Sequence, residues 1–230
     1  MEAVNNAILV ETLNELAEDI EIVAVKIGML ASARVARTVA DFLQRDPALK
    51  VVLDPVFRSS SGAELLDGGG ARLLRERLLP LANVITPNID EAAALTGLSV
   101  RNLEEMRAAA GKLHEMGAKN VVITGGHLDK AIDLLSFTNS RGSTEQEVFK
   151  AERQRSRSTH GTGCAFSSAM ACHLALGRGL PEAVLLAKAY VGAAINNAQT
   201  VGRGIGPLHH LYRMNQPARR AYAAEAEAVN

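Results

Sequence analysis

The sequence predicts an α/β fold in which helices cover both faces of a mostly parallel sheet. Short runs rich in Val and Ile alternate along the chain with longer segments whose apolar residues recur at helical spacing. The first four of these runs are mostly apolar, which is typical of parallel strands buried on both faces. Two later runs are joined by the polar turn N-S-R-G-S, which predicts a hairpin at one edge of the sheet.

The elements of the first half follow from these patterns. Val4, Ile8 and Leu13 lie at helical spacing in the first helix, and Pro47 stops the second, because the residue before proline avoids the α region. Three glycines at 68–70 weaken the third helix, since glycine is a poor helix former. We therefore expect helices at 2–18, 33–45 and 63–79, and strands at 21–30 and 51–56.

The second half continues the alternation. Pro87 ends the third strand, and Gly97 and Gly117 are expected C-caps of the two helices that follow. The predicted strands are 83–86, 120–124, 131–138 and 145–152, and the predicted helices are 88–96, 103–116, 162–176, 181–199 and a weak Ala-rich helix at 218–228.

Length and composition exclude several classes of protein. The 230 residues are expected to form one domain, 1–230. Because 25 basic and 25 acidic residues cancel, we expect no broad cationic surface for nucleic acid or membrane. Aromatic residues make up 3%, too few for base-stacking platforms, and two cysteines exclude a disulfide scaffold. Without a membrane-spanning apolar run or a signal-peptide pattern, we expect a cytoplasmic protein.

The strongest candidate for a functional site is S-T-H-G-T-G-C-A, residues 158–165, at the start of a helix. Gly161 and Gly163 let the backbone approach a ligand closely, and the free N–H groups of a first helical turn bind anions such as phosphate. In that turn, Cys164 should have a lowered pKa and favour a thiolate that accepts a proton or attacks an electrophile. An ordinary glycine-rich helix start with a small buried cysteine explains the same pattern. Cys172 is expected in the core.

Polar residues also follow three predicted strands, where ligands of parallel sheets bind. Asp54 can hold Mg²⁺ or cap a turn. Asn88 and Glu91, three residues apart at the start of a helix, can contact Mg²⁺ or form a capping box. The motif T-G-G at 124–126 permits close approach of a nucleotide or forms a tight turn. Spacing alone does not separate these alternatives.

Several motifs occur together in one order. They are V-K-I-G-M-L (25–30), V-L-D-P-V (52–56) with S-G (61–62), I-T-P-N-I-D-E-A (85–92), T-G-G-H-L (124–128), T-H-G-T-G-C (159–164) and G-I-G-P-L-H-H-L (204–211). With them, the chain resembles the bacterial hydroxymethylpyrimidine/phosphomethylpyrimidine kinases of thiamine biosynthesis, from about residue 10 to 214. That family belongs to the ribokinase-like superfamily, alongside pyridoxal kinases. The resemblance implies a ribokinase-like three-layer α/β/α fold with an edge hairpin, and a homodimer.

The resemblance further implies phosphoryl transfer from Mg-ATP to a pyrimidine hydroxymethyl group, and then to the resulting monophosphate. By this analogy, Gly161, Thr162, Gly163 and Cys164 form the anion hole for the transferring phosphoryl group, and Cys164 takes the position of the catalytic base. The remaining implied site residues are Asp54, Asn88 and Glu91 for the magnesium and phosphates, Thr124 and Gly126 beside the nucleotide, and Gly28 and Met29 in the pyrimidine pocket.

Two features depart from the family pattern. Family members usually carry Lys at the position of Thr124, where an ammonium contacts the phosphates of ATP. They also open with a strand and a Gly-rich segment that binds the pyrimidine, and this sequence contains no such stretch. We therefore expect the N-terminal strand and substrate segment to be absent, either because the sequence is an incomplete version of a longer gene product or through true loss.

Two alternative functions stay open at this point. A pyridoxine/pyridoxal kinase of the same branch would act on a similar hydroxymethylated heteroaromatic ring. A non-catalytic ligand-binding module derived from the kinase fold would bind the pyrimidine without consuming ATP, although the retained set of Asp54, Asn88, Glu91 and Cys164 argues against it.

Overall fold

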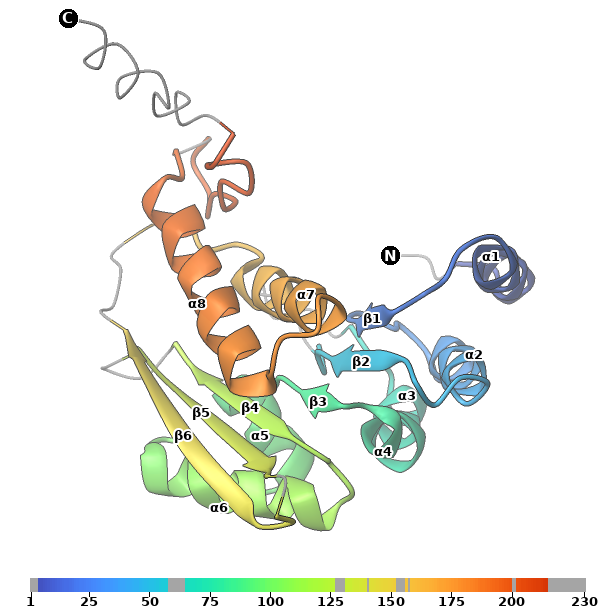
Figure 1. Ribbon diagram of the computed structural model, residues 1–230, viewed down its shortest axis with the longest axis horizontal. Helices are drawn as coiled ribbons and strands as arrows, with labels where there is room; N and C mark the ends of the chain where they lie inside the picture. The colour runs from blue at the N-terminus through green and yellow to red at the C-terminus, as the bar shows by residue number, and fades with distance from the viewer. Residues whose placement is uncertain are drawn as a thin grey trace, which may run out of the picture.

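The computed structural model describes residues 4–57, 65–126, 131–139, 141–151, 156, 158–199 and 202–214. Within these residues, six strands form one sheet in the order β1-β2-β3-β4-β5-β6 (Figure 1). Strands β1 to β4 are parallel, and β5 and β6 are antiparallel, so the mostly parallel sheet with an edge hairpin is confirmed. The strands are β1 (Ala24–Ile27), β2 (Lys50–Leu53), β3 (Val84–Ile85), β4 (Val121–Gly125), β5 (Ala131–Thr138) and β6 (Thr144–Ala151).

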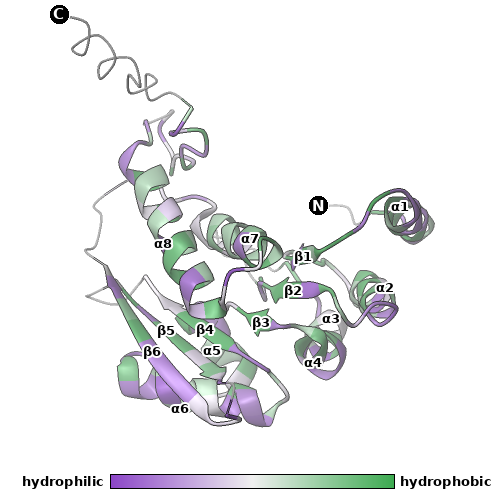
Figure 2. Ribbon diagram, viewed as in Figure 1, coloured by the Kyte–Doolittle hydropathy of each residue, from purple (hydrophilic) through white to green (hydrophobic). Residues whose placement is uncertain are grey.

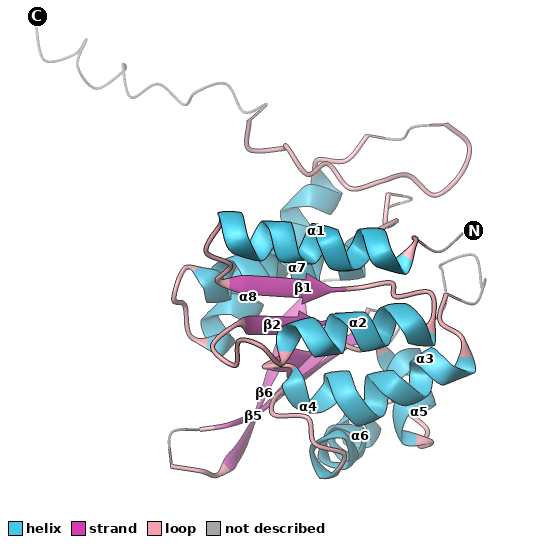
Figure 3. Ribbon diagram, turned by 90° about the vertical axis from the view of Figure 1, so that its right-hand side faces the viewer, coloured by secondary structure: helices cyan, strands magenta, loops and turns pink. Residues whose placement is uncertain are grey.

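Helices cover both faces of this sheet. Helices α7 and α8 pack on one face, and α2 to α6 lie on the other, so the three-layer arrangement is also confirmed (Figures 1 and 3). The helices are α1 (Asn6–Asp19), α2 (Ala33–Leu43), α3 (Gly68–Leu73), the π-helical turn η1 (Leu74–Leu78), α4 (Leu79–Leu81), α5 (Ile89–Thr96), α6 (Leu103–Glu115), α7 (Thr162–Ala175) and α8 (Leu180–Asn196).

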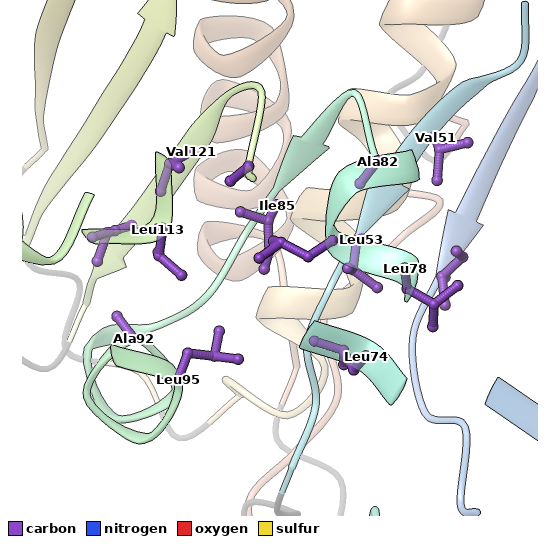
Figure 4. Packing of buried hydrophobic residues seen from close by; sticks show 14 of the residues in the cluster. Val51, Leu53, Leu74, Leu78, Ala82, Ile85, Ala92, Leu95, Leu113 and Val121 are labelled. Carbon is purple, nitrogen blue, oxygen red and sulfur yellow. The ribbon is translucent and has the colours of Figure 1, made fainter. Parts of the chain in front are cut away.

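Successive side chains of the strands supply two apolar cores. Leu53 and Ile85 face the α2 to α6 layer, where they pack with Leu78 and other apolar side chains (Figure 4). Val52 and Val84 face the opposite way, into the core beneath α7 and α8. The central strands are accordingly mostly hydrophobic (Figure 2). Burying each such side chain stabilises the fold by about 1.5–3 kcal/mol.

The three glycines at 68–70 do not disrupt the helix predicted over 63–79, because the helix begins with them. The Asp67 side chain caps this start by accepting the Gly70 N–H at 2.6 Å. A side chain at Gly70 would collide with Leu66, whose Cδ1 lies 2.4 Å from the position of a Cβ, so this close approach requires glycine. The helix then continues through η1 into α4.

The remaining expectations differ mainly at the ends of elements. Gly97 is the left-handed C-cap of α5, with φ of 74°, whereas α6 is capped by Met116 and Gly117 follows it. The predicted strand at 21–30 shortens to β1. The loop at 58–62, His127 and the weak helix at 218–228 lie outside the described residues. Within the described part of the chain, no helix is long and apolar enough to cross a membrane.

Candidate active site

Polar side chains replace apolar ones where the parallel strands end, on the face of the sheet that α7 and α8 cover. Further back on that face lie Val52, Val84 and Val122, all buried in the core. Because side chains alternate along a strand, the residues two positions further on face the same helices, and these are Asp54, Thr86 and Thr124. The backbone N–H groups of Asp54 and Thr86 still bond to the neighbouring strands, each at 2.9 Å.

Lys26 is a site residue that the sequence analysis missed. It pairs with Val52 across β1 and β2 and therefore shares a face with Asp54. Its Nζ lies 3.3 Å from Asp54 Oδ2. Asp54 is 5% exposed, and the same oxygen accepts a hydrogen bond from Ser167 Oγ on α7 at 3.0 Å. The buried carboxylate thus has partners from a strand and from a helix, as a buried charge requires. The sequence feature that could have identified Lys26 is a single lysine inside an apolar strand.

The glycine-rich segment enters α7 beside this pair. Gly161 is the N-cap of α7 with φ of 84°, a left-handed conformation that favours glycine. Thr162 begins the helix, Gly163 and Cys164 complete its first turn, and Cys164 is exposed. A helix start presents backbone N–H groups and the positive end of the helix dipole, which together suit an anion. Cys172 lies exposed further along α7, so its expected place in the core is wrong.

The pKa of the Cys164 thiol is raised, contrary to the expectation that the helix start would favour a thiolate. Partial burial of the side chain is the largest cause, and the negative charge of Asp54 adds to it. The charge of Lys26 and its hydrogen bonding to the thiol act in the opposite direction but do not outweigh these effects. The thiol is therefore mainly protonated at neutral pH.

Asn88 and Glu91 form the capping box that the sequence left as an alternative. The Asn88 side chain accepts the Glu91 N–H, and the Glu91 carboxylate accepts the Asn88 N–H, both at 2.9 Å. The pKa of Glu91 is nevertheless raised to about 7, mainly because the carboxylate is desolvated. The charges of Asp54 and Asp90 also raise it, whereas the hydrogen bond from the Asn88 backbone lowers it. A role in capping α5 does not remove Glu91 from the site.

The carboxylates of Asp54 and Glu91 fit a magnesium ion. They come from the end of β2 and the first turn of α5, and the charge of Asp54 acts on the pKa of Glu91. Mg²⁺ typically takes one or two carboxylates and completes its octahedral shell with water and substrate phosphates. Among the described residues, no group of three or more His, Cys, Asp or Glu is placed to hold a metal alone. The donor set therefore suits an ion shared with bound phosphates.

The end of β4 carries Thr124 next to Asn88, because the two residues form an isolated parallel bridge. The neighbouring Gly125 N–H donates a hydrogen bond to Asp133 Oδ1 at 3.0 Å. Asp133 in turn forms an ion pair with Lys188 of α8. This second buried ion pair fixes the backbone at the end of β4, where the resemblance places the nucleotide.

Three other predicted site residues lie at the ends of β1 and β4. Gly126 is exposed in the turn after β4, and no atom of the described part of the chain beyond its own neighbours lies within 4 Å of the position of a Cβ there. Met29 follows β1 and is 51% exposed. At Gly28 the space is already taken, since the Lys26 Nζ lies 2.5 Å from the position of a Cβ. Gly28 therefore accommodates Lys26 within the protein itself.

The motif at 204–211 supports the segment that leads into α7, a role that the sequence analysis did not assign. The His160 N–H donates to the Gly206 carbonyl at 3.1 Å. Gly206 lies against Ser158, whose Oγ is 2.8 Å from the position of a Cβ, so a larger residue would require the Ser158 side chain to move. Two distant motifs thus shape one helix start.

Comparisons with known proteins identify relatives of this chain. The family model for phosphomethylpyrimidine kinase matches residues 1–209. The chain is 43% identical over 207 residues to the thiamine biosynthesis bifunctional protein ThiED of Geobacter sulfurreducens, which covers 89% of this chain and 41% of that protein. It is 41% identical over 199 residues to the hydroxymethylpyrimidine/phosphomethylpyrimidine kinase of Haemophilus influenzae, covering 86% of this chain and 74% of the relative. The chain therefore spans less than half of the first relative and about three quarters of the second.

Two solved structures share the fold. An ADP complex of Bacillus subtilis pyridoxal kinase has a TM-score of 0.83 at 35% identity, covering 92% of this chain and 79% of that one. A phosphomethylpyrimidine kinase from Clostridium difficile 630 has a TM-score of 0.73 at 36% identity, covering 84% and 78%. These structures confirm the ribokinase-like fold. The pyridoxal kinases among the relatives fit a pyridoxal kinase function, but not better than the pyrimidine kinases fit a pyrimidine kinase function. The matched residues, the named relatives and the fold agree that the chain belongs to the phosphomethylpyrimidine kinase family.

Proposed function

We propose that this chain transfers a phosphoryl group from Mg-ATP to 4-amino-5-hydroxymethyl-2-methylpyrimidine, and then to the resulting monophosphate, in thiamine diphosphate biosynthesis. The observation that carries the proposal is the meeting of Asp54, Cys164 and the start of α7 at the carboxyl end of β2. Phosphoryl transfer depends mainly on positioning and on stabilising negative charge. A helix start, a buried carboxylate and a group that takes up a proton supply these functions in one place.

The start of α7 would hold the transferring phosphoryl group. Gly161, with its positive φ, directly precedes the helix, whose first-turn N–H groups have no partner within the helix. Thr162 and Gly163 add no bulky side chain in front of these groups. Donors that are already oriented stabilise a developing negative charge without reorganisation, which is the basis of an anion hole.

Cys164 would accept the proton of the pyrimidine hydroxyl group. Asp54 raises the pKa of the thiol, which makes the thiolate a stronger base but reduces its fraction at neutral pH. The first phosphorylation needs this base because its acceptor is an alcohol. The second needs it less, because the acceptor is a phosphate oxygen that is already ionised at neutral pH.

Asp54 and Glu91 would hold Mg²⁺, with the Asn88 side-chain oxygen close to the ion or its waters. When bound, the ion supplies positive charge that neutralises phosphate oxygens. The pKa of Glu91 is raised to about 7, and loss of its proton gives the carboxylate the negative charge that binds the cation. ATP would lie along Thr124 and Gly126, as the family resemblance implies. The ADP and AMP-PCP complexes of pyridoxal kinase relatives support the use of an adenine nucleotide.

The test is a substrate panel with purified protein, Mg²⁺ and ATP. We expect ADP release that depends on the hydroxymethylpyrimidine, with both the monophosphate and the diphosphate formed. Faster phosphorylation of pyridoxal would establish the alternative activity, which the pyridoxal kinase neighbours motivate. Binding of the pyrimidine without ATP consumption would establish the non-catalytic module.

We also infer a single-domain, cytoplasmic protein that forms a homodimer, and the family resemblance implies the dimer. The strand order leaves β1 at one end of the described sheet, so its outer edge faces away from β2. Exposed strand edges favour association with another chain. Analytical ultracentrifugation would test the dimer, and a monomer at micromolar concentration would contradict it.

A further inference from the structure

We propose that Lys26 is a positioning residue of this site, that its ammonium group holds Asp54 and Cys164 in their working arrangement, and that Gly28 leaves the room for it. The inference rests on the proposed kinase function. It adds a residue outside the predicted set and gives Gly28 a role different from contact with the pyrimidine.

The ammonium lies among three other polar groups. Lys26 is on β1, Asp54 follows β2, and Cys164 and Ser167 are on α7. Lys26 Nζ and Ser167 Oγ both contact Oδ2 of Asp54, at 3.3 and 3.0 Å. One oxygen of the carboxylate thus takes a contact from β1 and a contact from α7.

Lys26 and Asp54 interact strongly because both side chains are largely buried. The side chains of Lys26 and Asp54 are 19% and 6% exposed, so water competes weakly for their charges. Removing one partner of such a pair leaves the other charge buried without compensation. Both charges act on the Cys164 thiol, in opposite directions. A shift of the ammonium would therefore change the surroundings of the carboxylate and of the sulfur together.

Gly28 supplies the second, independent observation. A Cβ at this position would lie 2.5 Å from Lys26 Nζ and 3.6 Å from its Cε, and apart from the two adjoining residues no other described atom lies within 4 Å. Gly28 is not among the described glycines with positive φ, so its backbone does not require glycine. Glycine is needed here for its small size, because a side chain would occupy the space of the Lys26 ammonium group.

The first test is a double-mutant cycle measured by steady-state kinetics. Lys26→Met should lower kcat for the pyrimidine by roughly 10- to 100-fold, the scale of a misplaced catalytic group, with a much smaller change in KM. Gly28→Ala should act in the same direction. In the Lys26→Met background, Gly28→Ala should add less than about twofold, because the group it displaces is gone. A Gly28→Ala effect that persists there, mainly in KM, would overturn the proposal in favour of direct pyrimidine contact.

The second test does not use kinase activity. Iodoacetate and iodoacetamide react with the same thiolate, so the ratio of their rates at Cys164 reports the nearby charge and not the thiolate fraction. Lys26→Met should lower the iodoacetate preference by roughly fivefold, the factor for unit charges about 4 Å apart in water. Gly28→Ala should lower it as well. The exposed Cys172 is an internal control whose ratio should not move.

The two tests separate failure of this inference from failure of the proposed function. An unchanged reagent ratio at Cys164 would overturn the role of Lys26 even in a chain that phosphorylates the pyrimidine. A ratio lowered by Lys26→Met, together with a wild-type chain that has no kinase activity, would overturn the function and support the contact. Lys112→Met is the matched control, because Lys112 forms an exposed ion pair with Glu115, and it should leave both readouts unchanged.

Discussion

The hydroxyl group of Ser167 bonds to the carboxylate of Asp54 at 3.0 Å and joins α7 to the end of β2 across 113 positions of the chain. Ser167→Ala should leave this buried carboxylate with one partner fewer and lower the free energy of unfolding by about 1–3 kcal/mol. Urea denaturation measures the loss. Ser168→Ala is the matched control, because Ser168 is the exposed neighbour on the same helix, and it should change stability by less than about 0.5 kcal/mol.

Cys164 should matter more for the first phosphorylation than for the second. Cys164→Ala is expected to lower kcat with the hydroxymethylpyrimidine by about 10²–10⁴, the usual contribution of a general base. The effect with the monophosphate should be smaller, since that acceptor is already ionised. Product analysis with each substrate separates the two steps. Equal turnover of Cys164→Ala and the wild type would exclude the base role, and Cys172→Ala serves as the control.

Glu91 should make stability depend on pH. Its pKa is about 7 in the fold against 4.5 in the unfolded chain, so the native state binds the proton more tightly between these values. The stability that this group contributes is therefore complete below about pH 4.5 and is lost as the pH rises through about 7.

The measurement is urea denaturation of the wild type and Glu91→Gln at a series of pH values. Relative to Glu91→Gln, the wild type should lose roughly 2–4 kcal/mol over this interval. Glutamine keeps an oxygen for the Asn88 N–H, so the capping box stays available in the variant. A stability difference that stays constant over the interval would contradict the raised pKa.

Gly161 and Gly163 should respond to alanine in opposite ways. Gly161 has φ of 84°, and a Cβ there meets open space, so Gly161→Ala should cost about 1–3 kcal/mol through backbone strain alone. Gly163 lies in helical backbone with equally open space, so Gly163→Ala should stabilise the helix by up to about 1 kcal/mol. Thermal unfolding distinguishes the two, and equal shifts in Tm would contradict the conformational argument.

The π-helical turn η1 contributes to stability through its buried side chain. Leu78 is 0% exposed, so Leu78→Ala should lower the free energy of unfolding by about 2–5 kcal/mol. Leu176, which is 75% exposed beyond the end of α7, is the matched control, and Leu176→Ala should change it by less than about 0.5 kcal/mol. Urea denaturation of the two variants is the check. Similar losses from both would mean that the turn is not packed as described.

The sequence by itself determined the order and type of the elements. Hydrophobic periodicity and the Gly and Pro residues that end helices and strands depend only on residues close together in the chain. The alternation of buried strands and helices predicted the parallel sheet, and the turn at 139–143 predicted the edge hairpin. Local spacing likewise placed Gly161 and Cys164 at a helix start and identified the Asn88–Glu91 pair. It did not show that the glycines at 68–70 begin a helix, since that depends on Asp67 and Leu66 around them.

Only the tertiary structure decided which of these residues meet and with what charge. Lys26 looks like one polar residue in an apolar strand until the parallel register puts it beside Asp54. The pKa of Cys164 was predicted to fall from its place at a helix start, yet it rises, because burial and the Asp54 charge come from elsewhere in the chain. A motif records what each residue is able to do, whereas desolvation and neighbouring charges, which set how it behaves, arise only when distant segments pack together.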